Sequence, residues 1–159
     1  MSIEKNKQII RRLFETFQAH DLAALEELVD NDIVHTSPES GETRGIDGYR
    51  EIIREAIATF PDLSPEIESM LAEGDRVATV HRVNGTHGGD YDGIPPSHQP
   101  FGILVSDLFT LRDGKVVEHH EYYDVLGILR RIGGASEELR PGGEDWPRGG
   151  AILKPVRSE

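Results

Sequence analysis

The spacing of apolar residues along the sequence changes near Pro61, and this change limits the folds that the chain can adopt. Before Pro61, apolar residues recur every three or four positions, which is typical of amphipathic helices. After it, short runs rich in β-branched and aromatic residues alternate with turn-forming segments, which is typical of strands. Helices followed by strands predict an α+β fold, in which three N-terminal helices cover one face of a curved antiparallel sheet.

Seven segments carry this pattern. Helices are predicted at 6–21, 22–30 and 47–60, and strands at 66–73, 76–87, 101–111 and 115–124. A chain of 159 residues favours one domain, which we place at 1–133. Residues 134–159 are rich in Gly, Pro and charge, so a tail is expected there that is loosely ordered or crosses to a partner subunit.

Composition excludes several classes of function. A net charge of −12 leaves no basic face for a phosphate backbone, so no nucleic-acid partner is expected. The chain has no cysteine, which excludes a thiolate nucleophile and fits a reducing compartment. The N-terminal residues do not resemble a signal peptide and no stretch resembles a membrane span, so we expect a soluble, cytoplasmic protein without membrane contact.

Cofactor motifs are lacking as well. The sequence has no GxGxxG, phosphate-loop or GxSxG motif, and its seven histidines do not show the HExxH spacing of zinc enzymes. We therefore expect neither a cofactor nor a metal.

The last predicted strand, "KVVEHHEYYD", concentrates acid–base side chains. Strand alternation divides them into two rows, one containing even-numbered residues 118–124 and the other odd-numbered residues 117–123. Alternation alone leaves open which row faces the interior, and a solvent-exposed or dimer-contacting row is the alternative for either.

Three further polar residues are candidates for an interior site. Asp107 is surrounded by apolar neighbours in "FGILVSDLFTL", so its carboxylate is expected to be buried and hydrogen-bonded. His35 follows the second predicted helix and can act as an acid or base if a carboxylate orients it. His81 and its neighbour Arg82 point to opposite faces, so one of them is expected inside. The pocket walls are expected to include Phe14, Phe17 and Phe60.

The fragments "NDIVH", "FPDL", "AEGDRVATV", "NGTHGGDYDGIPP" and "LRDGKVVEHHEYYDVLGILRRIG" occur in a characteristic order and spacing. Through them the chain resembles the SnoaL-like polyketide cyclase family, also called ester cyclases, from about Lys5 to Gly133. The resemblance implies the cone-shaped α+β barrel of the nuclear transport factor 2 superfamily, shared with ketosteroid isomerase and limonene epoxide hydrolase. It also implies a homodimer.

Members of that family close rings by intramolecular aldol condensation in an apolar pocket, with an Asp as general acid and base. By the resemblance, Asp124 takes this role, and Glu118 and His35 match further family positions. We expect His120 or His35 to assist Asp124, and the row Glu118, His120, Tyr122 and Asp124 to line the cavity together with His81 and Asp107. Two departures are seen: His120 stands where the family has Trp, and "PPSH" replaces Pro-Thr-Gly. The resulting hypothesis is a cofactor-independent cyclase or isomerase that acts on a hydrophobic ketone-bearing metabolite.

Two other functions stay open at this point. A limonene-type epoxide hydrolase needs an Asp–Arg–Asp set, for which Asp107, Asp124 and Arg82 are available, although Val105 occupies the position where a nearby Arg is wanted. The third possibility is a small-molecule-binding or dimerisation module without chemistry, because a fold does not fix a function.

Overall fold

The computed structural model describes residues 2–134, which form a six-stranded sheet with helices packed against it. The helices are α1 (Ile3–Ala19), α2 (Leu25–Leu28), α3 (Ile46–Thr59) and α4 (Val125–Ile132). The strands are β1 (Val29–Ser37), β2 (Gly41–Arg44), β3 (Ser64–Glu73), β4 (Arg76–Thr86), β5 (Pro100–Arg112) and β6 (Lys115–Tyr123). The predicted α+β class is confirmed. The prediction of a tail at 134–159 lies outside the described residues except for Gly134.

The sheet order is β2-β1-β6-β5-β4-β3. Neighbouring strands run antiparallel except for β1 and β6, which are parallel. The prediction of a fully antiparallel sheet is therefore corrected to a mixed sheet. The error arose because the residues of β1 were predicted to be the end of the second helix and a loop after it. The pairing of this segment with a strand about 80 residues later was therefore not considered.

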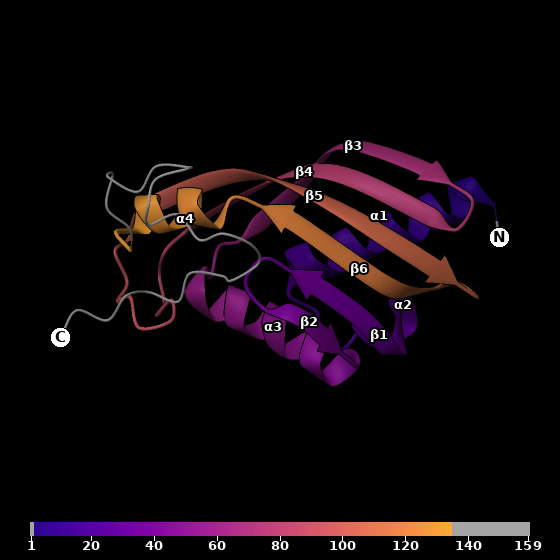
Figure 1. Cartoon of the computed structure of the whole chain (residues 1–159), viewed down its shortest axis with the longest axis horizontal. Helices are drawn as coiled ribbons and strands as arrows, with labels where there is room; N and C mark the ends of the chain where they lie inside the picture. Colours follow the sequence, from indigo (N-terminus) through magenta and orange to yellow (C-terminus); the bar gives the residue numbers. More distant parts are fainter. Residues whose placement is uncertain (1, 135–159) are drawn as a thin grey trace, which may run out of the picture.

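Figure 1 shows the helices gathered along the sheet, with α1 behind the strands and α3 beside β1 and β2. Ser2 caps α1 by accepting a hydrogen bond from the amide of Lys5 at 3.3 Å. α3 begins after Gly45, whose φ of 86° lies in the left-handed region that favours glycine, and its C-cap is Phe60, directly before Pro61. The predicted helices 6–21 and 47–60 therefore match α1 and α3 closely, whereas the predicted helix 22–30 is limited to the four residues of α2, because β1 begins at Val29.

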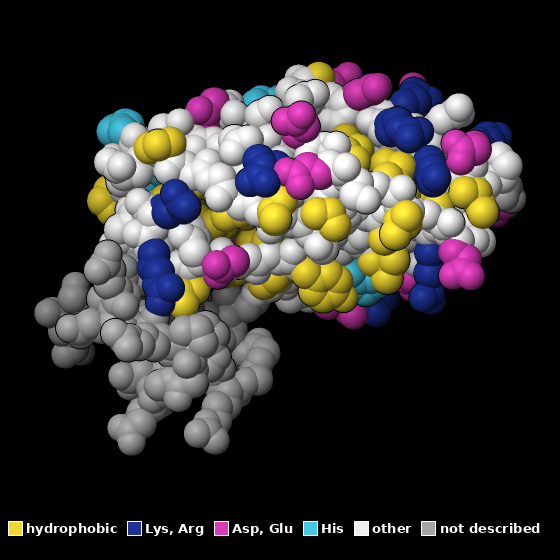
Figure 2. Space-filling model, turned by 90° about the horizontal axis from the view of Figure 1, so that it is seen from above, with side chains coloured by type: hydrophobic (Ala, Val, Ile, Leu, Met, Phe, Trp, Pro, Cys, Tyr) yellow, Lys and Arg dark blue, Asp and Glu magenta, His cyan; other side chains and the backbone are white. Residues whose placement is uncertain are grey.

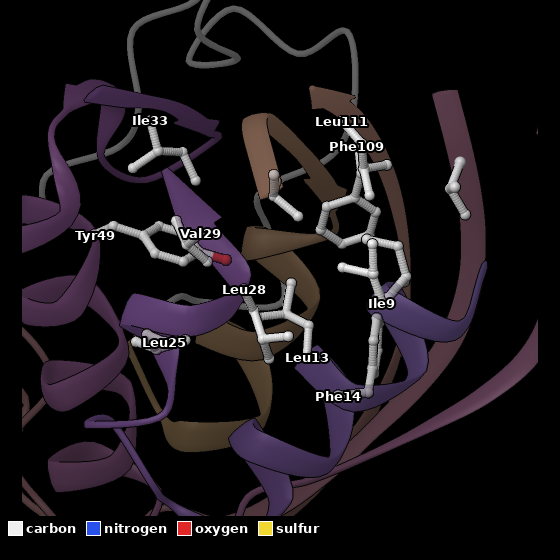
Figure 3. Close-up of a cluster of buried hydrophobic side chains, with 13 residues drawn as sticks. Ile9, Leu13, Phe14, Leu25, Leu28, Val29, Ile33, Tyr49, Phe109 and Leu111 are labelled. Atoms are coloured by element: carbon white, nitrogen blue, oxygen red, sulfur yellow. The ribbon is translucent and has the colours of Figure 1, made fainter. Parts of the chain in front are cut away.

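Two hydrophobic clusters fill the space between helices and sheet. The larger one joins α1, α2, the start of β1 and the inner faces of the strands, as Figure 3 shows. Its fully buried members include Ile10, Leu13 and Phe109. The smaller one lies beside α4 and contains Phe60, Phe101, Ile128, Leu129 and Ile132. The helices thus cover the concave side of the sheet, which is where an interior site has to lie.

Leu13 offers a direct test of this packing. Its side chain is 0% exposed in the larger cluster, so Leu13→Ala should lower the free energy of unfolding by about 2–5 kcal/mol. Ile3→Ala on the same helix should cost far less, because Ile3 is 42% exposed. Urea denaturation of the two variants measures the difference. Equal losses would show that Leu13 does not lie in a packed core.

Candidate active site

Polar side chains from four strands meet on the inner face of the sheet. The strand registers set Thr79, Asp107 and Glu121 side by side across β4, β5 and β6. The neighbouring row places Phe109 opposite His119 and His119 opposite His35 of β1. Two adjacent rows therefore bring carboxylates and imidazoles together inside an otherwise apolar interior.

His35 and Glu121 form the shortest contact between an imidazole and a carboxylate in this group. His35 Nε2 lies 3.1 Å from Glu121 Oε2, and the His35 side chain is 1% exposed. The Glu121 side chain is 26% exposed, whereas that of Asp107 is 2% exposed. Of the two carboxylates, Glu121 is therefore the more accessible.

His119 is held from three sides. The Tyr49 hydroxyl lies 2.9 Å from its Nδ1, and the Phe109 ring stacks on the imidazole at a centroid distance of 4.3 Å. Its Nε2 lies 3.6 Å from Asp107 Oδ1 and 3.9 Å from Glu121 Oε1. The imidazole therefore stands between a phenol and two carboxylates, with its orientation fixed by the aromatic stack.

Asp107 is buried and partnered, as its apolar sequence context predicted. Thr79 donates a hydrogen bond from its hydroxyl to Asp107 Oδ2 at 3.3 Å, and His81 Nδ1 lies 3.4 Å from the same oxygen. The His81 ring meets the edge of Phe14 at 4.8 Å. Of the pair His81 and Arg82, His81 is the inner residue, while Arg82 donates to Glu68 in an exposed ion pair.

The environment shifts the pKa of several of these groups. Burial raises the pKa of Glu121, but the hydrogen bond with His35 and the charges of the histidines outweigh burial, and the pKa falls below its ordinary value. Burial lowers the pKa of His119, but the nearby carboxylates of Asp107 and Glu121 raise it above its ordinary value. Burial and the same two carboxylates hold the pKa of the Tyr49 phenol well above its usual range. These directions favour an ionised Glu121 beside a histidine that accepts protons readily.

Four polar atoms of the group have no hydrogen bond within the described part of the chain. They are His35 Nδ1, His81 Nδ1, His119 Nε2 and Asp107 Oδ1, all fully buried. Buried polar atoms are nearly always paired in folded proteins. Three of these atoms still take part in ion-pair contacts within the group, because His81 Nδ1 lies 3.4 Å from Asp107 Oδ2 and His119 Nε2 lies 3.6 Å from Asp107 Oδ1. The loose contacts leave hydrogen-bonding capacity that a polar ligand could use.

The prediction for the last strand chose the wrong row. The structure turns His119, Glu121 and Tyr123 inward, whereas Tyr122 is 61% exposed. Glu118 accepts a hydrogen bond from Thr110 at 2.9 Å, and His120 pairs with Leu108, both away from the interior group.

Figure 2 shows one face of the molecule, where hydrophobic side chains lie among acidic and basic ones.

The even-numbered row was chosen from the family resemblance, whereas a bulge in β6 sets the row that faces inward. Leu111 pairs with Val116 but Thr110 pairs with Glu118, so Val117 is an extra residue. Val116 is fully buried in the core and so is His119, although strict alternation would put them on opposite faces. One inserted residue therefore reverses the row that follows it.

Asp124, predicted to be the catalytic residue, is exposed at the N-cap of α4. Its carboxylate accepts a hydrogen bond from the amide of Gly127 at 2.8 Å. This is the geometry of a helix cap, which holds the carboxylate away from His35, Asp107 and Glu121.

Of the other predicted residues, His35, His81 and Asp107 lie in the interior group, and Phe14 packs against it. Phe17 is partly buried next to Phe14, while Phe60 belongs to the smaller cluster. Sequence reasoning missed His119, Glu121 and Tyr49 as site residues. The acid–base richness of "EHHEYYD" was the right signal, but the bulge that selects its inner row leaves no pattern in one sequence.

Comparisons with known proteins show the family of the chain. The sequence profile of the SnoaL-like polyketide cyclase family matches residues 7–132, so the chain belongs to that family. The structural neighbours share the fold of the nuclear transport factor 2 superfamily. Family membership supports a cyclase or isomerase role.

Among individual relatives, the chain is 26% identical over 114 residues to nogalonic acid methyl ester cyclase of Streptomyces nogalater, covering 71% of this chain and 76% of the relative. The solved structure of AclR from Streptomyces galilaeus is 30% identical with a TM-score of 0.76, covering 85% of this chain and 100% of that one. A SnoaL-like protein from Jannaschia sp. CCS1 is 26% identical with a TM-score of 0.79, covering 86% and 97% of the two chains. No helix among residues 2–134 has the length and apolar character needed to cross a membrane.

The capping role of Asp124 leads to a prediction. Asp124→Ala should lower the free energy of unfolding by about 1 kcal/mol, and Asp124→Asn should retain it because asparagine also caps helices. Urea denaturation measures both, and neither change should abolish turnover. An Asp124→Asn variant with wild-type stability and no turnover would restore the catalytic role predicted from the family resemblance.

The buried His81 leads to a second prediction. Burial lowers the pKa of His81 below 6.5 despite the raising effect of Asp107, so the folded protein binds a proton there less readily than the unfolded chain. The contribution of His81 to the free energy of unfolding is therefore present in full above pH 6.5. It is lost as the pH falls toward the lower pKa that His81 has in the folded protein. Phe14→Leu should let water approach the ring and raise the pKa toward 6.5, as ¹⁵N NMR titration would measure. Phe60→Leu, in the other cluster, is the control, and an equal shift in both variants would show that Phe14 does not keep water from His81.

Proposed function

We propose that this protein is a cofactor-independent cyclase or isomerase that acts on a hydrophobic, ketone-bearing polyketide, with Glu121 as the general acid and base. The observation that carries the proposal is the His35–Glu121 contact at 3.1 Å, which holds a partly exposed carboxylate inside an apolar interior. Asp107 is less accessible and Asp124 is turned away, so Glu121 is the carboxylate best placed to reach a bound ligand.

The chemistry follows from these positions. In an intramolecular aldol closure, Glu121 removes the proton next to a ketone, and the resulting enolate carbon attacks a second carbonyl carbon of the same molecule. The electron pair of that carbonyl moves to its oxygen, which takes the proton back from Glu121. His119, whose pKa is raised, can donate a hydrogen bond to the enolate oxygen, and His35 orients the carboxylate.

The surroundings of Glu121 support a flat apolar substrate. Tyr123 follows it on the same face of β6 and packs against the smaller hydrophobic cluster near α4. Apolar surface therefore continues from the carboxylate toward Phe60 and Phe101. The relative from Streptomyces nogalater is named for cyclising a methyl ester, which makes a polyketide ester the first substrate class to test.

The epoxide hydrolase alternative requires an Asp–Arg–Asp set that the structure does not assemble. Asp107 is inside, Asp124 caps α4, and Arg82 pairs with Glu68 at the outside. A binding module without chemistry remains the alternative, and the homodimer implied by the family stays a prediction.

The test combines turnover with proton exchange. Purified protein is offered a panel of polyketide ketones and esters, and ring closure and α-proton exchange in D₂O are followed by mass spectrometry and NMR. Glu121→Gln should lower both rates by about 10²–10⁴-fold, the usual contribution of a general acid or base. His120→Gln is the matched control, because His120 is the neighbouring residue that faces away from the site.

Each outcome has a distinct meaning. A folded Glu121→Gln variant with wild-type exchange and turnover would refute the role of Glu121. Ligand retention by the wild-type protein without exchange or turnover would favour the binding module.

A further inference from the structure

We propose that His35, His119 and Glu121 form a binding site for a divalent first-row transition-metal ion such as Zn²⁺. One ligand atom from each residue can be chosen so that all three lie within 4.8 Å of one another. Two imidazoles and a carboxylate are a donor set that such ions prefer. This inference concerns binding and does not rest on the proposed function.

The distances are close to those of a coordination sphere. Metal–ligand bonds of about 2.0–2.2 Å in a tetrahedral site place neighbouring ligand atoms about 3.4 Å apart. His35 Nε2 is 3.1 Å from one oxygen of Glu121, and His119 Nε2 is 3.9 Å from the other. Side-chain shifts on the order of 1 Å suffice to bring the three residues onto one ion.

The second observation is the state of His119. Its Nε2 is buried and lies 3.6 Å from Asp107 Oδ1, too far for a good hydrogen bond, while its Nδ1 faces the Tyr49 hydroxyl at 2.9 Å. When the Nδ1 proton is donated to that hydroxyl, the Nε2 lone pair is free to bind a metal. Histidine ligands in metal sites are regularly oriented in this way by a partner on the other ring nitrogen.

The local charge also favours a cation. Asp107 Oδ1 lies 3.6 Å from His119 Nε2 and has no hydrogen bond in the described chain. It places a second carboxylate beside the three ligands, either as a fourth ligand or as a neighbouring charge. Two carboxylates in a mostly buried space make the site negatively charged whenever the neighbouring histidines are neutral, and this charge favours the binding of a divalent ion.

Sequence spacing gave no indication of this site. His35 comes from β1, whereas His119 and Glu121 alternate on β6, and the parallel pairing of these strands brings His35 opposite His119. An ion at this place occupies the lone pairs of Glu121, so metal binding and proton abstraction by Glu121 exclude one another. The ion should therefore inhibit whatever acid–base turnover the protein has.

The test is titration of the EDTA-treated, tag-free full chain with Zn²⁺ by isothermal calorimetry, and with Co²⁺ followed by its visible absorption. One ion per chain should bind, with a rise in Tm, because a ligand that binds only the folded state stabilises it. His119→Gln and Glu121→Gln should each weaken binding at least about 10-fold, and Tyr49→Phe should weaken it by about 10-fold through the orientation of His119.

Two controls separate this site from others. His120→Gln should bind Zn²⁺ as tightly as the wild-type chain, since His120 lies on the other face of β6. Circular dichroism of each variant checks that it is folded, and Glu121→Gln, which keeps the side-chain shape, guards against loss of binding through misfolding.

The proposal is overturned if no saturable binding is seen with Zn²⁺ or Co²⁺. It is also overturned if folded His119→Gln and Glu121→Gln bind as tightly as the wild-type chain, or if binding is lost in His120→Gln instead. Failure of turnover in the functional test leaves this measurement unaffected, because calorimetry does not depend on a substrate.

Discussion

The burial of two carboxylates, Asp107 and Glu121, against the concave face of the sheet is the constraint that organises the rest of the site. Removing a carboxylate from water is costly unless it is paired and hydrogen-bonded. Thr79 and His81 contact one, His35 contacts the other, and His119 stands between the two. The imidazoles of His35, His81 and His119 therefore supply the polar contacts that the two carboxylates need inside the protein.

The fold supplies the remaining conditions. α1 and α3 cover the concave face with Phe14 and Tyr49, which keep the polar group in an apolar surrounding and orient His81 and His119. The bulge at Val117 turns His119 and Glu121 toward this space. A packed hydrophobic core and a reactive polar group thus share one side of the sheet, as in a preorganised site.

Much of the fold could be predicted from the sequence, since α1, α3 and four of the strands show strong local periods. β1, β2 and α4 were missed. β1 follows a short helix and is interrupted by polar residues, β2 has only four residues, and α4 directly follows a strand. His35, His81 and Asp107 were found because a polar residue is conspicuous in an apolar context. Glu121 and His119 could not be selected, because their inward direction depends on a bulge and on the parallel pairing of β1 with β6.

Our main claim is that Glu121, oriented by His35, is the group that meets the reacting carbon of the substrate. A crystal structure of the protein with an unreactive polyketide ketone tests it most directly. We predict that the carbon next to the ketone lies within about 3.5 Å of the Glu121 carboxylate, the distance of a reactive arrangement. A ligand bound beside Asp124 or on the outer face of β6, out of reach of Glu121, would contradict it.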